Sequence, residues 1–353
     1  MQLTKPKLSN ISSRRLVIHP SFEATIAEIR AKKITLPSEA LPTDVNFSSY
    51  DIPQDGERLS TIEKLGRTKL DAEAGQSLCN KMLLCAYDES IDKFQGLQGT
   101  GYLTSHSLVL HGIDDYIPMN LLTFYFYTRS GVLSHGSANI RHSEDPDADS
   151  KKDYVQDRSE FLIDNVPEES LIFIDGPLVG RQMTRYTLDL SESLMNKNVV
   201  PIFSVKNSTS NMVTDNVLAL KDKYNSDMHW AYSYLKEGER TNFFKYTDQS
   251  DETRARAGKA FTKIFCYLKA FNVSPSRIEI DVKTFEKHKK SVEAWMDLAY
   301  YLLVAQGDLK NPQVRSIAVA EKYARATLNL INFPHLMKEL GITPTMNQER
   351  FAW

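Results

Sequence analysis

The chain has 353 residues, of which 41% are hydrophobic and 25% charged, so its composition is that of a globular protein and excludes a disordered or fibrous one. Its 43 Lys and Arg against 45 Asp and Glu give a formal net charge of −2, which neither requires nor excludes a nucleic-acid partner. No apolar run reaches the roughly 20 residues of a membrane span, and three cysteines without a C-x-x-C pair favour a cytoplasmic location.

Charge is distributed unevenly along the chain. Residues 1–33 carry seven basic and two acidic residues, residues 254–290 ten basic and three acidic ones, and residues 142–192 five basic and thirteen acidic ones. Such runs are common on solvated surfaces. They also suit a protein that holds a polyanion at its rim and cations at its centre. On that interpretation the two basic segments contact a phosphate backbone without reading bases.

The N-terminal part of the chain is predicted to be an arm with one short helix. Residues 1–20 show no packing pattern, residues 21–33 can form a short helix, and the prolines that follow mark a loop. A polar helix is expected over residues 57–80.

Three short apolar runs come next, at residues 82–87, 107–112 and 121–128. Their close spacing and the turn residues between them predict an antiparallel three-stranded meander. The acidic segment 142–153 is expected to be a solvated loop.

From residue 154 onward, helices and strands are expected to alternate. The predicted strands 171–174 and 199–205 are continuously apolar, which is typical of parallel strands buried on both faces. Helices are expected at 154–164 and 180–197. Further strands are expected at 264–271 and 277–282, and helices fill the C-terminal third.

This order of elements favours an α/β fold with a ribonuclease H-like mixed sheet, in which three antiparallel strands are continued by parallel strands. Helices flank the sheet, and the C-terminal region is helical. The expected domains are an N-terminal arm and short helix (1–56) and a main domain (57–345), which comprises a core (80–210), an insertion (206–260) and C-terminal strands and helices (264–345).

Acidic residues stand where this fold order brings metal ligands together. Asp88 ends the first strand, Glu160 lies on the intervening helix, and Asp175 ends the fourth strand. Two divalent ions about 3.5–4 Å apart, which activate water and stabilise the leaving oxygen, require several such oxygen ligands. Structural roles are also open, because Asp175 can cap the next helix and Glu160 can be an ordinary surface residue.

A fourth acid lies on the apolar face of a C-terminal helix. Glu321 fills the gap in the stripe between Ile317 and Ala324, at positions +4 and −3. A carboxylate directed inward is unfavourable unless it is paired or binds a metal. Glu321 is therefore expected to be either a metal ligand or the partner of a neighbouring Lys or Arg.

Several motifs resemble the NurA nuclease domain. LIFIDGPL (171–178), followed by a helix and then by VVPIFSVKNSTSNMV (199–213), resembles the second conserved block of that family, and SRIEIDV (276–282) resembles its R-[VI]-E-[LI] strand. The resemblance covers roughly residues 80–340. The chain departs from the family where Asp88-Glu89-Ser90 replaces Asp-Gly-Ser, and where Glu321 replaces a histidine.

The resemblance implies a ribonuclease H-like, Mn²⁺-dependent DNA nuclease that forms a homodimer and works with a hexameric HerA-type ATPase in DNA end processing. It further implies that Asp88, Glu160 and Asp175 bind metal. Lys206 would stand near the site, where an ammonium can neutralise charge on the phosphate.

The sequence therefore predicts a DNA nuclease in which two Mn²⁺ or Mg²⁺ ions bind at Asp88, Glu160, Asp175 and Glu321, acting in DNA repair or defence. The departures from the family motifs keep an alternative open: a NurA-like adaptor that binds DNA and a ring ATPase but cleaves poorly or not at all. A nuclease directed at RNA is a third possibility.

Overall fold

The computed structural model describes residues 26, 29, 50–51, 57–63, 66–111, 115–135, 140–179, 183–217, 220–310 and 312–345. The chain divides into two units, residues 1–38 and 39–353, and the elements below belong to the second. The predicted arm and nearly all of the predicted helix at 21–33 lie outside the described residues, as does most of the basic segment 1–33. These three expectations stay predictions.

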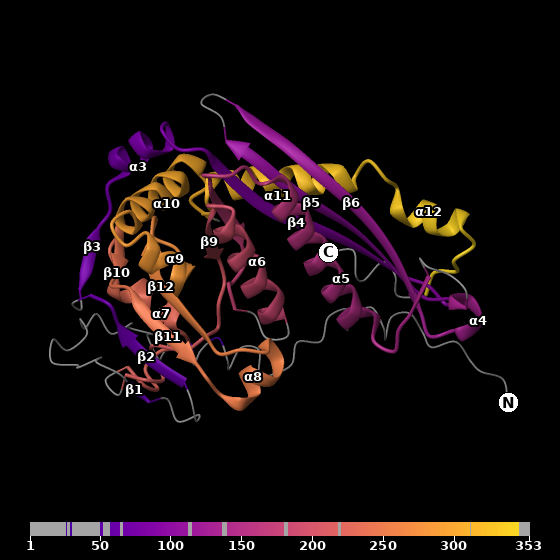
Figure 1. Cartoon of the computed structure of the whole chain (residues 1–353), viewed down its shortest axis with the longest axis horizontal. Helices are drawn as coiled ribbons and strands as arrows, with labels where there is room; N and C mark the ends of the chain where they lie inside the picture. Colours follow the sequence, from indigo (N-terminus) through magenta and orange to yellow (C-terminus); the bar gives the residue numbers. More distant parts are fainter. Residues whose placement is uncertain are drawn as a thin grey trace, which may run out of the picture. The chain divides into compact units, whose positions relative to one another are not determined.

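The centre of the sheet has the predicted order (Figure 1). Strands β4 (Leu84–Gln95), β5 (Thr100–His111) and β6 (Tyr116–Thr128) form an antiparallel meander. On the other side of β4, strands β8 (Leu171–Asp175) and β9 (Val200–Val205) run parallel to it. Three antiparallel strands continued by parallel ones confirm the predicted fold class.

The sheet extends further than the sequence suggested. Beyond β9 come β13 (Ser276–Asp281), β12 (Phe261–Lys269), β11 (Phe244–Asp248), β2 (Glu57–Thr61) and β1 (Tyr50–Asp51), all antiparallel to their neighbours. β10 (Glu239–Thr241) pairs with β12 and with β3 (Arg67–Lys69), and β7 (Ile140–His142) pairs with β6. The segment expected to be an insertion therefore contributes two strands to the sheet.

Helices cover both faces of the sheet. A hydrophobic cluster on one face includes residues of α5 (Pro146–Asn165), α6 (Thr184–Asn196) and α7 (Asp227–Tyr234). The cluster on the other face includes residues of α3 (Ala72–Cys79), α9 (Val282–Lys287), α10 (Val292–Gln306) and α11 (Arg315–Leu328). The remaining described helices are α4 (Gly131–Ser134), α8 (Asp251–Ala257) and α12 (Phe333–Glu339). No helix in the described part of the chain has the length and apolarity needed to cross a bilayer.

The predicted helix over residues 57–80 is wrong for its first half. Residues 57–61 and 67–69 are strands that pair with β11 and β10, far away in the sequence. Only α3 is helical, and it begins where the side chain of Asp71 accepts hydrogen bonds from the backbone N–H groups of Glu73 and Ala74. Strands of this kind depend on partners that local sequence does not reveal.

The acidic segment expected to be a loop is mostly helix. α5 begins at Pro146, and the Asp145 side chain caps it by accepting a hydrogen bond from Ala148 N. Asp147 and Asp149 lie in the first turn, where negative charge interacts favourably with the helix dipole. The acidic residues therefore stabilise the first turn of a helix, and the segment is not the solvated loop that was predicted.

The alternation of side chains along β4 decides what the site can contain. Leu84 and Ala86 pack in the cluster on the α10–α11 face, whereas Cys85 and Tyr87 pack in the cluster on the α5–α6 face. Because successive side chains of a strand point to opposite faces, the next residue, Asp88, belongs to the α10–α11 face.

Candidate active site

Asp88 and Asp175 are neighbours on adjacent parallel strands. Tyr87 of β4 is paired with Ile174 of β8, so the residues that follow them lie side by side. Asp175 ends β8, but β4 continues to Gln95, so the prediction that Asp88 ends its strand is wrong: pairing with β5 extends the strand beyond its apolar run. Asp175 is in turn paired with Ser204 of β9. The structure thus brings together two acids that are 87 positions apart in the chain, on the face of the sheet that α11 covers.

Both carboxyl groups titrate abnormally because they are buried and close to other acids. Burial, together with the charges of Asp175 and Glu89, raises the pKa of Asp88 to about 8, although Lys206 acts in the opposite direction. The Asp88 side chain is only 6% exposed. Burial also raises the pKa of Asp175, with Lys206 opposing and Glu321 reinforcing the increase. Without a metal ion, burial therefore favours the protonated form of both acids, and a cation bound beside them would favour the ionised form.

Glu321 and Lys206 complete this side of the site. Lys206 Nζ lies 3.4 Å from Asp175 Oδ1 and 3.7 Å from Glu321 Oε2. Glu321 also accepts hydrogen bonds from Gln313 at 2.9 Å and from Arg325 at 2.6 Å. Burial alone would raise the pKa of Glu321, but these contacts hold it below its usual value. These contacts are those of the second sequence-based alternative, in which Glu321 pairs with a neighbouring Lys or Arg.

The structure does not bring Glu160 to this cluster. Its side chain is exposed on α5, where it accepts a hydrogen bond from Gln156 one turn earlier. The buried charged residue of α5 is Arg158, whose charge acts on Glu89. Two positions turn a side chain by about 200° around a helix, so Glu160 and Arg158 point in opposite directions.

Sequence reasoning missed Glu89 and Arg158. Glu89 follows Asp88 on β4 and therefore faces α5. Burial raises the pKa of its carboxyl group, and the charge of Arg158 and a hydrogen bond from the Tyr87 hydroxyl oppose this increase. Its Oε2 atom is buried and accepts no hydrogen bond. The charges of Asp175 and Lys206 also act on it. The alternation of side chains along a strand could have revealed Glu89, because it places Glu89 and Asp88 on opposite faces of the sheet from the sequence alone.

The donor set suits a hard divalent cation. Asp175 Oδ1 is buried and accepts no hydrogen bond, although Lys206 lies nearby. Among the described residues, no three His, Cys, Asp or Glu side chains are grouped closely enough to hold an ion by themselves. Mg²⁺ and ions like it often take only one or two carboxylates and complete their shell with water and substrate phosphate. Asp88 and Asp175 fit that kind of ligation.

The basic segment 254–290 is not the uniform phosphate-binding surface that was expected. Lys263, Lys269 and Arg277 are buried. Lys263 Nζ and Arg277 Nε lie 2.7 and 2.8 Å from Glu279 Oε1, and Lys269 donates to a backbone carbonyl. These residues form internal ion pairs and hydrogen bonds, so part of the charge read as a surface feature stabilises the fold.

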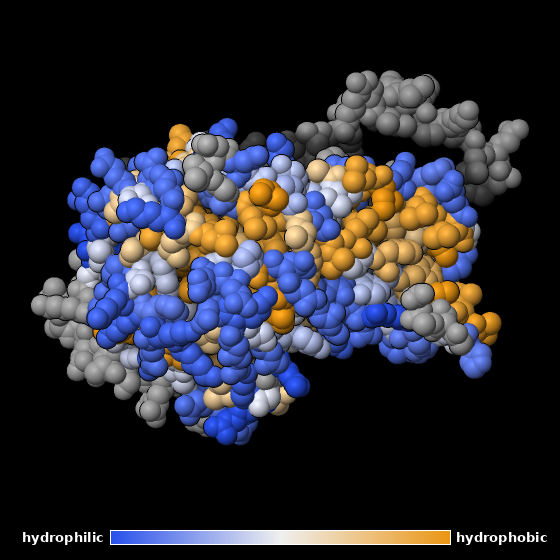
Figure 2. Space-filling view, turned by 45° about the horizontal axis from the view of Figure 1, so that its top comes forward, coloured by the Kyte–Doolittle hydropathy of each residue, from blue (hydrophilic) through white to orange (hydrophobic). Residues whose placement is uncertain are grey.

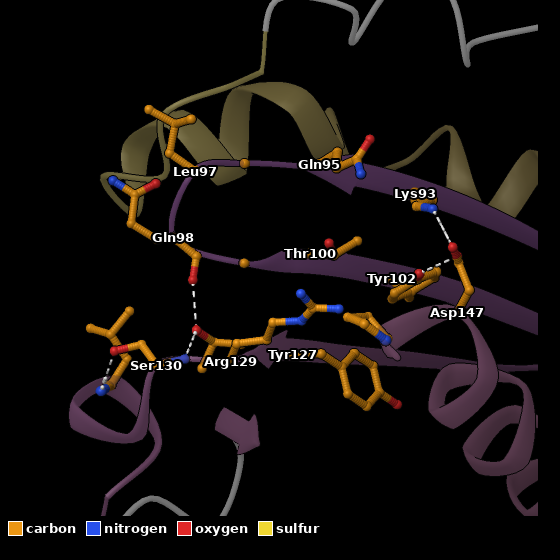
Figure 3. Close-up of a pocket in the computed structure, with 15 residues that line it drawn as sticks. Lys93, Gln95, Leu97, Gln98, Thr100, Tyr102, Tyr127, Arg129, Ser130 and Asp147 are labelled. Atoms are coloured by element: carbon orange, nitrogen blue, oxygen red, sulfur yellow. Dashed lines mark hydrogen bonds and ion pairs between the residues drawn. The ribbon is translucent and has the colours of Figure 1, made fainter. Parts of the chain in front are cut away.

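A separate cavity of about 480 Å³ lies at the far end of the long strands (Figure 3). Lys93 Nζ donates to Asp147 at 2.7 Å on one side of it, and Gln98, Thr100 and Arg129 line the other parts. Lys93 is five residues after Asp88 on β4, which corresponds to about 16 Å along a strand. The carboxylates of the candidate site do not line this cavity.

Comparisons with known proteins give one family match and several similar structures. The chain matches the NurA domain model over residues 18–326. Its structure is similar to the NurA nuclease from Sulfolobus solfataricus, with 11% identity, a TM-score of 0.51 and coverage of 95% of this chain and 99% of that one. A NurA bound to dAMP and manganese (9% identity, TM-score 0.36, 91% and 93% covered) and the endonuclease V of Bacillus subtilis (10%, 0.36, 72% and 90%) also match. A search of curated proteins gives no match.

Proposed function

Since the chain belongs to the NurA domain family, we propose that it is a metal-dependent DNA nuclease, as its sequence predicted. The observation that supports this most strongly is the pair Asp88 and Asp175, two carboxylates side by side on adjacent parallel strands, at the point where β8 ends. Burial is the main cause that raises both pKa values, and a cation bound between the two carboxyl groups would favour their ionised forms.

Each residue of the site has a distinct part in the proposed reaction. Asp88 and Asp175 would hold Mn²⁺ or Mg²⁺, which when bound supplies Lewis-acid activation of the scissile phosphate. Lys206, between Asp175 and Glu321, would offset negative charge on the phosphate through its ammonium group. Glu321, with Gln313 and Arg325, would hold Lys206 in place.

The test is cleavage of linear DNA by the purified chain with Mn²⁺, with and without EDTA. Asp175→Asn is expected to lower the rate by about 100-fold or more, because it removes a charged ligand while keeping the shape of the side chain. Asp164→Asn, at an exposed acid of α5, is the matched control and should cleave at the wild-type rate. Undiminished cleavage by Asp175→Asn would refute the proposal. Cleavage of RNA of the same sequence, measured in parallel, shows whether the substrate is DNA or RNA.

One observation favours the alternative of a DNA-binding adaptor with little or no activity. The acids of the site already have internal cations, since Lys206 pairs with Asp175 and Glu321 and the charge of Arg158 acts on Glu89. The same assay separates the two functions: DNA binding that EDTA does not weaken, without cleavage at any Mn²⁺ concentration, would identify the adaptor.

A homodimer and a HerA-type ATPase partner are carried forward as proposals. Figure 2 shows hydrophobic residues gathered on one face of the molecule. Strand β6 exposes Ile117 by 61% and Met119 by 41% on one face of the sheet, and Phe124 by 41% on the other. Exposed apolar groups of this kind are typical of protein interfaces. Light scattering on the purified chain should give twice the mass of one chain, and a monomer would exclude the dimer.

A further inference from the structure

The position of Lys206 bears on how many metal ions the site can take. Its ammonium lies between Asp175 and Glu321, 3.4 and 3.7 Å from the nearest carboxylate oxygens. An ion at that place would need the same oxygens at about 2.0–2.1 Å, the distance typical of Mg²⁺. The side chain therefore fills the space where a second ion, shared by these two acids, would bind.

On the opposite face of the sheet, the acid that follows Asp88 on β4 is Glu89. It is directed toward α5, where the positive charge of Arg158 favours its ionised form. Glu160, the acid of this helix that the sequence predicts as a ligand, points away from the sheet. Among the described residues, this face therefore adds no acid to the pair formed by Asp88 and Asp175.

Asp88 and Asp175 are the acids that remain for a metal. They occupy neighbouring positions on parallel strands, and the Asp88 carboxylate accepts a hydrogen bond from Glu89 N and forms no ion pair with a described residue. We propose that this site binds a single divalent ion, between Asp88 and Asp175, and that Lys206 takes the place of the second ion. This inference rests on the proposed nuclease function and replaces the two ions that the sequence predicts with one.

Lys206 is suited to that role for a physical reason. An ammonium group is a compact point charge with three donors on a flexible stem, so it can move from the carboxylates to a phosphate oxygen. Unlike a metal ion, the ammonium group is covalently attached to the protein and needs no coordinating ligands. Its charge is one unit rather than two, so it offsets less of the negative charge of a phosphate.

Counting the bound ions tests this inference without any cleavage. Free Mn²⁺ is followed by electron paramagnetic resonance while it is titrated into the full chain, first alone and then with saturating nucleoside monophosphate, which supplies a phosphate and cannot be cleaved. One ion per chain is expected in both titrations. Two ions, or none, would overturn the inference.

Variants of Lys206 assign its role. Lys206→Ala should raise the count to two, because Asp175 and Glu321 then share an unoccupied space, whereas Lys206→Arg should keep it at one. Lys152→Ala, at an exposed lysine of α5, is the control and should also give one. An unchanged number of bound ions in a folded Lys206→Ala protein would overturn the role of Lys206. If that variant does not fold, the number of ions bound by the wild-type chain tests the inference.

Cleavage by the same samples keeps the two proposals separate. Two ions together with Mn²⁺-dependent cleavage would leave the nuclease in place and reject the single-ion site. One ion without cleavage of DNA or RNA would reject the nuclease and leave the single-ion site standing.

Discussion

Glu279 Oε2 accepts a hydrogen bond from the backbone N–H of Leu178, at 2.8 Å, and so connects strand β13 to the turn that follows Asp175. Glu279 is fully buried, and its other oxygen pairs with Lys263 and Arg277. Arg277 in turn donates to Ser208, two residues beyond Lys206. One buried carboxylate and its partner thus hold the segments that follow two residues of the candidate site.

Glu279→Gln is expected to destabilise the chain by about 3 kcal/mol or more, since it leaves two buried cations without their counter-charge. Urea unfolding at pH 7 measures the change. Glu286→Gln, at an exposed acid of α9, is the control and should stay within about 0.5 kcal/mol of the wild type. Equal stabilities of the two variants would show that the Glu279 network contributes little.

Gly176, the residue after Asp175, has a φ of +95°, and an added Cβ would meet no atom within 4 Å. Gly176→Ala is therefore expected to destabilise the chain through backbone conformation alone, by about 1–2 kcal/mol. Gly131→Ala, in α4, also meets no atom and has no positive φ, so it should be neutral or slightly stabilising. Thermal unfolding of both variants checks the difference, and a neutral Gly176→Ala would contradict it.

Asp88 makes the stability of the metal-free chain depend on pH. Its pKa of about 8 lies well above the ordinary value of 3.8, so between these two pH values the folded chain keeps a proton that the unfolded chain has lost. Stability should therefore fall as the pH rises through this window, by up to about 1.4 kcal/mol per pH unit.

Asp88→Asn resembles the protonated acid and should remove this dependence. In EDTA the variant is expected to match the wild type near pH 4 and to exceed its stability at pH 8. Urea unfolding at several pH values provides the comparison. Parallel slopes of stability against pH for the two proteins would mean that Asp88 is ionised at neutral pH.

Glu89 rather than Glu160 is expected to matter for activity. Glu89→Gln should lower Mn²⁺-dependent cleavage by about 10-fold or more, because it leaves the buried Arg158 without its counter-charge beside the site. Glu160→Gln changes an exposed acid and should keep the wild-type kcat/KM within about twofold. Equal losses in the two variants would restore Glu160 to the site.

Much of the fold could be predicted from local pattern. Continuous apolar runs identified β8 and β9 to within a residue or two, and short spacing identified the meander. Strands β2 and β3 could not be recognised, because their apolar content is low and their stability comes from pairing with β11 and β10, which follow them by 183–191 and 170–174 residues. The start of α5 was readable in principle, since Asp145 and Pro146 are a cap and a first-turn proline.

By itself, the sequence determined that Asp175 ends its strand and that Glu321 lies on the inner side of its helix, because these properties depend only on neighbouring residues. It did not show that β4 continues to Gln95, which places Asp88 inside that strand. Tertiary structure alone decided which charges meet. Electrostatic attraction depends on distance in space rather than along the chain. Packing of the strands and helices therefore decided that Lys206 lies between two acids and that Arg158, rather than Glu160, points toward the sheet.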